Sequence, residues 1–442
     1  MKSSHVLYLG REYENFDILS LNVYFFYFEV KVVMVPYIYD FLLVLMLYVL
    51  YKSGKEIART GKIKSHAGLA AILVYTLNEG LRFGRGIDYN LYGMRYEELV
   101  KTGESDWDIS FQIIARALIT LDIPWQGYVM LMSLIFILAT IFLLRIYKEF
   151  LPYALPLYSL FSIGAVENMV RWYMGFSFMM IGLYYLLCDE RRSYLKYWSF
   201  SAFACTIHFA LLPLPFVFYL LHTFKKPILS PIWVLLIYFV IALAFQTEYM
   251  AQFVGIATLL SASVGGDSAV SSKIENYGDR ADYWLTGGFA GTESHSALPD
   301  VQELLFLCII IWLGYKVIRG AHRKYVFAYN MFVFGFLFNP LARQIELIGR
   351  YNQPFMFFRA IVLACIIGNI YVNKIVRVRQ IVWLMVLLVF LNIGRRTFVG
   401  PFKGNPEQYL YVWNQGGRTY QSMYDMWIDD MFESDAKNQK KK

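Results

Sequence analysis

Apolar runs of the length that a bilayer requires recur along the chain, and this feature restricts the fold more than any other. Runs such as Val35 to Leu50, Gly127 to Leu144 and Trp172 to Leu187 approach the roughly 20 residues of a transmembrane helix. Charged residues make up only 17% of the sequence, below the roughly 25% of soluble domains. Since a backbone in lipid must satisfy its own hydrogen bonds, we predict an all-α integral membrane protein, a polytopic bundle of about 11–12 transmembrane helices.

Charge and cysteine usage exclude other classes of protein. The formal net charge is +8, but the basic residues fall in short clusters between apolar runs, as the positive-inside rule expects, and indicate no nucleic-acid partner. The four cysteines lie within or at the ends of apolar runs, without CxxC or Cys/His spacing. We therefore expect packing cysteines, no disulfide framework, no metal site and no cofactor.

One segment decides the predicted topology. Read as a single span, Tyr197 to Leu221 would place the later basic clusters outside the cell. Read as two short half-helices that meet near His208, before Pro213 and Pro215, it places them all in the cytoplasm. We predict this broken or re-entrant pair, since interrupted helices are tolerated at membrane depth where they line a cavity.

Three regions follow from this topology. Residues 1–34 are a charged N-terminal leader of uncertain status, and Met34 is an alternative start. Residues 35–394 form the membrane domain, in which 246–300 is a long extracytoplasmic loop rich in Ser and Gly. Residues 395–442 are a polar C-terminal tail.

Charged residues outside the cytoplasmic clusters are expected to converge on the extracytoplasmic face. They are Arg82, Arg85, Asp88, Glu167, Arg171, His208, Arg343, Glu346 and Arg350. Arginine presents a planar fork that suits phosphate oxygens, so several around one cavity indicate an anionic ligand such as a lipid pyrophosphate. An alternative stays open, because the three- and four-residue spacings within these groups are also those of ordinary intrahelical ion pairs.

The segment Leu81 to Tyr92 is the most unusual of these sites. Gly84 and Gly86 either let backbone approach a ligand or end a helix. If the following residues are helical, Tyr89, Tyr92 and Tyr96 share a face, which is either a carbohydrate platform or an interfacial aromatic belt. The belt is the more common arrangement.

Two residues are candidate proton acceptors. His208 stands among apolar residues at the predicted helix break, where it is either a core histidine or a base near neutral pH. Asp88 is the second candidate if burial raises its pKa. The acidic cluster of Glu104, Asp106 and Asp108 is either a divalent metal site or a solvated loop. The loop is favoured, because a site for a hard cation needs further oxygen ligands that the spacing does not show.

At these residues the chain resembles the EpsG family of Wzy-type polysaccharide polymerases. The family pattern R-Y-x-x-G-x-D-Y-x-x-Y is matched at Arg82, Phe83, Gly86, Asp88, Tyr89 and Tyr92. Shorter patterns are matched at Glu104 to Trp107, Val170 to Trp172, Ile207 to Ala210, and Arg350. The resemblance covers roughly Val35 to Ile393, and Trp172 stands where the family usually has Gln.

The resemblance implies polymerisation of undecaprenyl-pyrophosphate-linked oligosaccharide repeat units at the outer face of a bacterial inner membrane, in O-antigen, capsule or exopolysaccharide synthesis. A regulator of chain length is an implied partner. As a hypothesis for this chain, the catalytic residues are Asp88, His208 and Arg171, and the substrate-binding residues are Arg82, Arg85, Tyr89, Tyr92, Arg343 and Arg350. The reaction would be inverting and independent of metal.

Two other classes remain as alternatives. A lipid-phosphate-dependent glycosyltransferase of the GT-C type would use acidic residues and a metal in its first external loop, where Asp88, Asp106 and Asp108 lie. A transporter of lipid-linked oligosaccharides would have a similar basic cavity, but the sequence lacks the matched pair of interrupted spans that marks inverted repeats.

Overall fold

The computed structural model describes residues 18–105, 107–188, 193–244, 301–343, 346–373, 387, 394, 397–399, 402 and 405–439. The elements within these ranges are helices, and the described residues contain one isolated antiparallel β-bridge, between Arg82 and Tyr411. The predicted all-α fold is confirmed.

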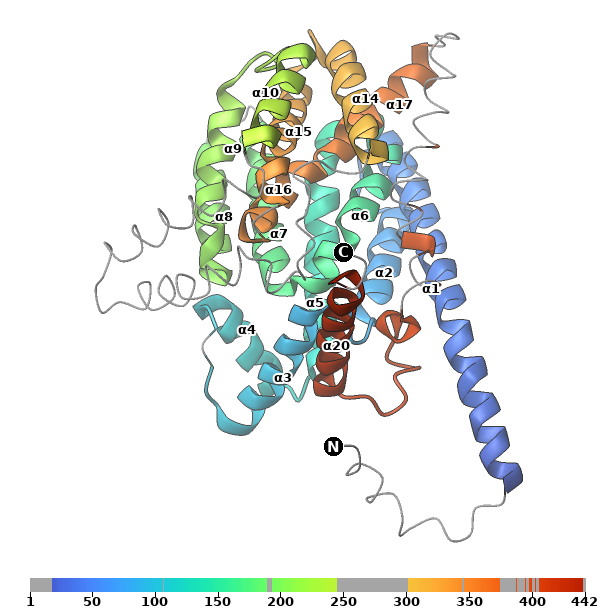
Figure 1. Ribbon diagram of the computed structural model, residues 1–442. Helices are drawn as coiled ribbons and strands as arrows, with labels where there is room; N and C mark the ends of the chain where they lie inside the picture. The colour runs from blue at the N-terminus through green and yellow to red at the C-terminus, as the bar shows by residue number, and fades with distance from the viewer. Residues whose placement is uncertain are drawn as a thin grey trace.

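Helices that run back and forth form a bundle in the first half of the chain (Figure 1). They are α1 (Ile18–Thr60), α2 (His66–Gly80), α5 (Trp125–Leu144), α6 (Leu151–Asn168) and α7 (Val170–Leu187). Their facing side chains, mainly Leu, Phe, Tyr and Met, belong to one continuous apolar core. Pro152 marks the beginning of α6, because the first turn of a helix leaves its N–H groups unbonded and loses nothing to proline.

A second group of helices completes the bundle. Its members are α8 (Ser193–Ile207), α9 (Pro213–Thr223), α10 (Pro231–Ala244), α14 (Val301–Ile318), α15 (Arg323–Ala342), α16 (Glu346–Phe357) and α17 (Arg359–Asn373). Helix α17 also packs against α6 and so joins the two groups. Within this second group, large side chains of α15 such as Tyr329 and Phe336 are fully buried.

Apolar length identifies a multi-pass membrane protein. Among the described residues, five helical segments are long and apolar enough to cross a membrane: Met34–Thr60, Trp125–Asn168, Val301–Ile318, Arg323–Ala342 and Ile348–Asn369. Shorter apolar helices accompany them, and many Leu, Ile and Phe side chains on the outside of the bundle are exposed, as lipid contact requires. The predicted total of about 11–12 spans goes beyond this criterion and stays a prediction.

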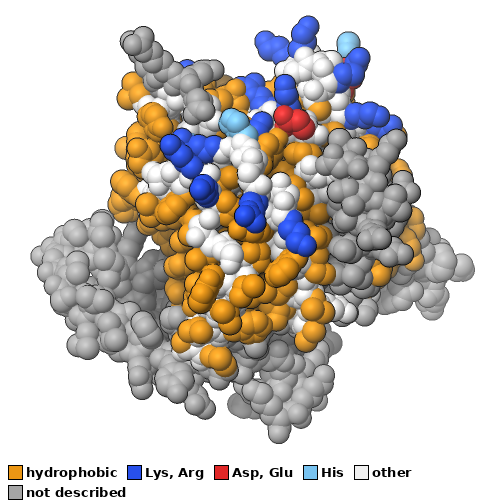
Figure 2. Space-filling view, turned by 90° about the horizontal axis from the view of Figure 1, so that it is seen from above, with side chains coloured by type: hydrophobic (Ala, Val, Ile, Leu, Met, Phe, Trp, Pro, Cys, Tyr) orange, Lys and Arg blue, Asp and Glu red, His pale blue; other side chains and the backbone are white. Residues whose placement is uncertain are grey.

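One end of the bundle is basic. Figure 2 looks down on this end and shows Lys and Arg side chains gathered there with few acidic ones. Contacts hold its parts together: Lys324 donates to the carbonyl of Ile146 at 2.8 Å, and Arg323 donates to the carbonyl of His222. The segment that precedes α6 and the connection between α14 and α15 therefore share this end.

The predicted helix pair around His208 is confirmed. Helix α8 ends at Ile207, a short 3-10 turn follows, and α9 begins at Pro213. The rings of Tyr194, early in α8, and His222, late in α9, lie 6.3 Å apart, so the two helices are antiparallel. His208 itself has an extended backbone at the tip of this hairpin.

Helix α1 is longer than predicted. It begins at Ile18 and continues through Met34, so no break separates residues 18–34 from the predicted first span. The predicted loop at 246–300 lies outside the described residues.

Helices α3 (Ile87–Thr102), α4 (Ile109–Thr120) and α20 (Tyr420–Gln439) lie at the end of the bundle opposite the basic one (Figure 1). Helix α4 buries Phe111 and Ala115 and exposes the polar Arg116 and Thr120.

The C-terminal segment is tied to the turn that follows α2, so the predicted tail is in part a packed element. The amide of Phe83 donates to the carbonyl of Leu410 at 2.9 Å, and that of Val412 donates to the carbonyl of Leu81 at 3.0 Å. The indole of Trp427 donates to the carbonyl of Gly84 at 2.7 Å. These bonds satisfy the backbone of a turn that belongs to neither helix nor sheet.

Gly84 and Gly103 form a matched pair for mutation. Backbone conformation favours glycine at both positions, and close packing favours it at Gly84 alone. Both have positive φ, +71° and +74°, but a Cβ at Gly84 would meet Met423 of α20 at 2.3 Å, whereas nothing lies within 4 Å at Gly103. We expect Gly103→Ala to cost about 1–2 kcal/mol of backbone strain and Gly84→Ala to cost clearly more. Thermal unfolding in detergent measures both, and equal shifts would contradict the close approach of α20.

Candidate functional site

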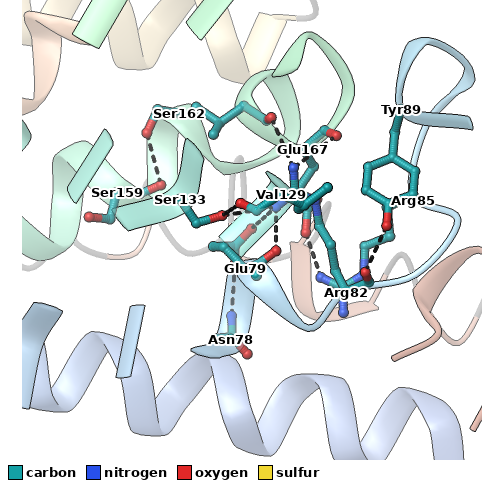
Figure 3. A network of polar contacts seen from close by, with 12 residues as sticks. Asn78, Glu79, Arg82, Arg85, Tyr89, Val129, Ser133, Ser159, Ser162 and Glu167 are labelled. Atoms are coloured by element: carbon teal, nitrogen blue, oxygen red, sulfur yellow. Dashed lines mark hydrogen bonds and ion pairs between the residues drawn. The ribbon is translucent and has the colours of Figure 1, made fainter. Parts of the chain in front are cut away.

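Seven of the nine charged residues predicted to converge form two networks at the end of the bundle opposite the basic one. Arg343 pairs instead with Glu303, and the side chain of Glu346 lies outside the described residues. The first network is buried and centres on Arg82 (Figure 3). Its guanidinium donates to the carbonyl of Glu79, and from Nη2 to the carbonyls of Val166 at 3.4 Å and Glu167 at 3.3 Å. The last carbonyls of a helix have no partner within the helix and form its negative end. Arg82 therefore caps the C-terminus of α6.

Arg85 extends this first network. It forms an ion pair of 2.5 Å with Glu167, and its guanidinium lies 4.4 Å from the ring centre of Tyr411 and 4.9 Å from that of Tyr39. The Arg85 side chain is only 3% exposed. A charge so enclosed must be paired, because burial of a single ion in an apolar interior is costly.

Three predicted substrate-binding residues thus contact the protein itself. Arg82 and Arg85 hold helix ends together, and the hydroxyl of Tyr89 lies 3.0 Å from both the carbonyl of Arg82 and Oε1 of Gln126. The turn that contains Gly84 and Gly86 likewise approaches protein: a Cβ at Gly86 would meet Asn168. The first network therefore positions elements rather than presenting groups to solvent.

The second network surrounds Asp108, the residue directly before α4. Its Oδ2 lies 3.3 Å from Nη1 of Arg171 and 3.2 Å from Nδ1 of His208. The three side chains are 15–17% exposed. One carboxylate thus connects the start of α7 with the tip of the α8–α9 hairpin.

Asp88 and Arg350 complete the second network. Nη2 of Arg350 lies 3.6 Å from Oδ2 of Asp88, with side-chain exposures of 30% and 20%. The guanidinium of Arg171 lies over the ring of Tyr92, 5.3 Å from the ring centre. Burial raises the pKa of the Tyr92 hydroxyl; Arg171 and Arg350 lower this pKa, and Asp88 raises it. We use the name reaction site for Asp88, Tyr92, Asp108, Arg171, His208 and Arg350.

Aromatic side chains form one wall of the reaction site. The ring of Trp172 lies edge-on to that of His208 at 5.3 Å and to that of Tyr351 at 5.2 Å. Trp172 is 4% exposed. A buried indole therefore packs against the histidine.

His208 is neutral near pH 7 in this setting. Burial is the largest cause and lowers its pKa below the usual 6.5; Arg171 and Arg350 lower it too, while Asp108 raises it. An ionised Asp108 only accepts hydrogen bonds, so Nδ1 of His208 carries the proton that it shares with Asp108. The tautomer leaves Nε2 with a lone pair, which is the form of a general base.

Sequence reasoning missed the role of Asp108. Its cluster was expected to be a solvated loop, and spacing gave no sign that a residue 63 positions before Arg171 and 100 before His208 would contact both. Among the described residues, no three His, Cys, Asp or Glu side chains are grouped as a metal site would need. Asp106 lies outside the described residues.

The intrahelical Glu167–Arg171 ion pair weighed above does not form. Helix α6 ends at Asn168 and α7 begins at Val170, so Glu167 and Arg171 belong to different helices. Glu167 pairs with Arg85 instead, and Arg171 pairs with Asp108. Arg350 pairs with Asp88 of α3 and Arg343 with Glu303 of α14 at 3.7 Å. The carboxylate near Arg82 is local, because Glu79 lies three residues earlier at 3.9 Å.

Neither interpretation of the tyrosine face is correct. Tyr89 and Tyr96 are 0% and 2% exposed and belong to a compact aromatic core with Trp107, Trp125 and Tyr128. They face α5 because α3 folds back onto the start of that helix. The helical periodicity of the sequence does not reveal this packing. Tyr92, half-buried, is the member that reaches the reaction site.

A family model described as the EpsG family matches residues 67–400. The chain belongs to the EpsG family. The match contains the reaction site and ends before the C-terminal segment at 405–439. Membership gives the protein a function of the polysaccharide-polymerase type. No match was found among the curated proteins or among the solved structures.

The buried pair of this EpsG-family protein allows a test of its structural role. Arg85→Met leaves the carboxylate of Glu167 without its cation, so we expect the free energy of unfolding to fall by about 3–5 kcal/mol. The double variant Arg85→Met/Glu167→Gln removes both charges and should regain part of that loss. Denaturation in detergent measures both; a double variant less stable than Arg85→Met would show that Glu167 is stabilised by other groups.

Proposed function

We propose that this EpsG-family protein joins undecaprenyl-pyrophosphate-linked oligosaccharide repeat units into a polysaccharide at the extracytoplasmic face of a bacterial inner membrane. The observation that carries the proposal is the meeting of Arg171, Arg350 and the Asp108–His208 pair at one end of the bundle. These groups supply what the reaction needs, namely cationic donors for a departing pyrophosphate and a base for an attacking hydroxyl.

The placement of the reaction site supports an outward-facing enzyme. Lys and Arg gather at the opposite end, which the positive-inside rule assigns to the cytoplasm. Helices α2 and α6 run from that end to the reaction site, and α5 and α7 run back. A substrate anchored in the outer leaflet would reach Arg171 at the start of α7.

Arg171 and Arg350 are the proposed pyrophosphate ligands. Each guanidinium has five N–H donors, and a contact with one carboxylate oxygen orients it without using them all. Nε of Arg171 is buried and has no hydrogen-bond partner among the described residues. A permanent charge with fixed donors stabilises a leaving pyrophosphate without reorganisation during the reaction.

In the proposed reaction a sugar hydroxyl of the acceptor attacks the anomeric carbon of the donor from the face opposite the pyrophosphate. A new glycosidic bond forms, and the bond between the anomeric carbon and the pyrophosphate oxygen breaks with its electron pair on that oxygen. Nε2 of His208 takes the hydroxyl proton. The products are a chain longer by one repeat unit, inverted at the new bond, and undecaprenyl pyrophosphate.

His208 is the preferred base, and Asp88 is assigned to orientation. Asp108 holds the imidazole in the useful tautomer and would stabilise the imidazolium that forms, as in other His–carboxylate pairs. Asp88 instead faces Arg350 at 3.6 Å, and a nearby cation makes a carboxylate a weaker base.

The direct test is polymerisation by purified protein in detergent with EDTA and lipid-linked repeat units. We expect a ladder of products spaced by one repeat unit, and at least a 100-fold lower rate for Arg171→Ala, the size of effect of one lost oxyanion donor. Arg116→Ala, an exposed arginine on the neighbouring α4, is the matched control and should keep the wild-type rate.

The same assay separates the alternatives. Addition of a single sugar that requires a divalent metal and a monosaccharide lipid donor would favour the GT-C class. Absence of any product, with lipid-linked substrate moved only between two compartments, would favour a transporter.

The pH profile tests the base. The neutral imidazole is the active form, so activity is present above its pKa and is lost as pH falls through it. Since the pKa of His208 is lowered, we expect the acidic limb below pH 6.5. Asp108→Asn removes a group that raises this pKa, so the limb should move to still lower pH and the maximal rate should fall. His208→Gln should abolish the limb; an unchanged limb would point to Asp88.

A further inference from the structure

Two neighbouring cavities lie between α6 and the second group of helices, apart from the reaction site. One has a volume of about 270 Å³ and is lined by polar residues that include Glu303, Arg343 and Arg359. The other, of about 360 Å³, shares Glu303 and Arg359 with it and extends to Glu167. Volumes of about 300–1,000 Å³ are usual for ligand pockets.

The smaller cavity, here the Arg343–Arg359 cavity, lies toward the extracytoplasmic end. Helix α15 begins with Arg323 at the basic end and ends at Ala342, and 20 helical residues span about 30 Å. Arg343 follows directly. Glu303 lies in the first turn of α14, at the corresponding end of another candidate span. The cavity is therefore near the membrane surface that the reaction site faces.

The charge of the lining favours an anion. Among the described lining residues, Arg343 and Arg359 provide two guanidinium groups and Glu303 provides one carboxylate, which lies 3.7 Å from Arg343. Arg359 lies over the ring of Phe161 at 4.4 Å, which holds its planar fork in place. Amides of Asn339, Asn352 and Gln353 add neutral donors.

Helix α16 lies between this cavity and the reaction site. Arg350 and Tyr351 contact the reaction site, whereas Gly349, Asn352 and Gln353 line the cavity. Gln353 also accepts a hydrogen bond of 2.6 Å from Tyr173, the neighbour of Trp172 in α7. The two sites are thus adjacent and share one short helix.

We infer that the Arg343–Arg359 cavity binds a phosphate or pyrophosphate group, and that this group is the headgroup of the lipid-linked acceptor. The inference rests on the proposed function. Joining two lipid-linked units leaves the pyrophosphate of the acceptor intact and separated by its own sugars from the hydroxyl that reacts. The protein must therefore accommodate two anionic headgroups at one membrane surface, and Arg171 with Arg350 provides for one.

Native mass spectrometry with undecaprenyl pyrophosphate, which lacks sugars, counts the sites. We expect two lipids on the wild type, one on Arg343→Gln/Arg359→Gln and one on Arg171→Gln/Arg350→Gln. Arg319→Gln, at the basic end, is the control and should keep two. Because Arg343→Gln leaves Glu303 unpaired, Glu303→Gln/Arg343→Gln is the second variant, and it should also weaken binding.

A second readout distinguishes binding from folding. Polymerisation is compared with a lipid-linked acceptor and with the same oligosaccharide lacking lipid and pyrophosphate. The wild type should prefer the lipid-linked acceptor, and the cavity variants should lose at least 10-fold of that preference while using the lipid-free acceptor at the wild-type rate. An inactive or misfolded protein would lose both activities together.

The outcomes separate this inference from the proposed function. An unchanged preference and two lipids on the cavity variants would overturn the inference and leave the polymerase intact. A wild type that binds one lipid, lost only in Arg171→Gln/Arg350→Gln, would overturn it as well. A wild type without any ladder would refute the proposed function, while lipid counting would still judge the cavity. If native mass spectrometry shows that inorganic pyrophosphate binds the wild type as tightly as the lipid does, and that Arg343→Gln/Arg359→Gln loses this binding, the ligand of the cavity is a free anion and not a lipid.

Discussion

The contact between Arg82 and the end of α6 is the constraint on which the rest of the site depends. Its guanidinium donates hydrogen bonds to the carbonyls of Val166 and Glu167, in place of the backbone N–H groups that the end of a helix lacks. Helix α6 then ends at Asn168, and α7 begins at Val170. Because the same arginine follows α2 directly, one side chain fixes where α3 begins and where Arg171 is presented. The Arg85–Glu167 pair repeats this connection a few residues away, sealed by Tyr411 of the C-terminal segment. Positioning and chemistry are thus divided between neighbouring residues of one turn.

The second network, where we propose that an anion binds, is nearly charge-balanced. Asp88 and Asp108 each hold an arginine from another element, so the guanidinium groups are oriented before a ligand arrives, and their remaining donors point to a defined place. The same carboxylate of Asp108 sets the tautomer of His208. Removing either carboxylate would therefore change more than net charge, because it would release a cation and alter a base at once.

Local sequence patterns predict the helical membrane fold, but they do not predict the contacts between distant residues that form the site. Apolar runs and basic clusters were sufficient to predict a helical membrane protein and the break at His208, because lipid imposes length and charge rules on every span. The motif at Arg82 to Tyr92 marked the right region, but the division between buried Arg82 and partly exposed Asp88 depends on which residues α6 and the C-terminal segment cover. Asp108 and Trp172 could not be assigned, since their partners lie 36 to 179 residues away. Contacts between residues so far apart in the sequence follow from the packing of the helices and not from the helical periodicity of the sequence.

The central claim is that a lipid pyrophosphate binds at the end of α7 that faces away from the basic surface. Its most direct test is an experimental structure with a bound, non-hydrolysable lipid-linked repeat unit. The account predicts pyrophosphate oxygens in contact with the guanidinium groups of Arg171 and Arg350, and a sugar near His208. A headgroup bound at the basic end, among residues such as Lys324 and Arg145, would contradict it.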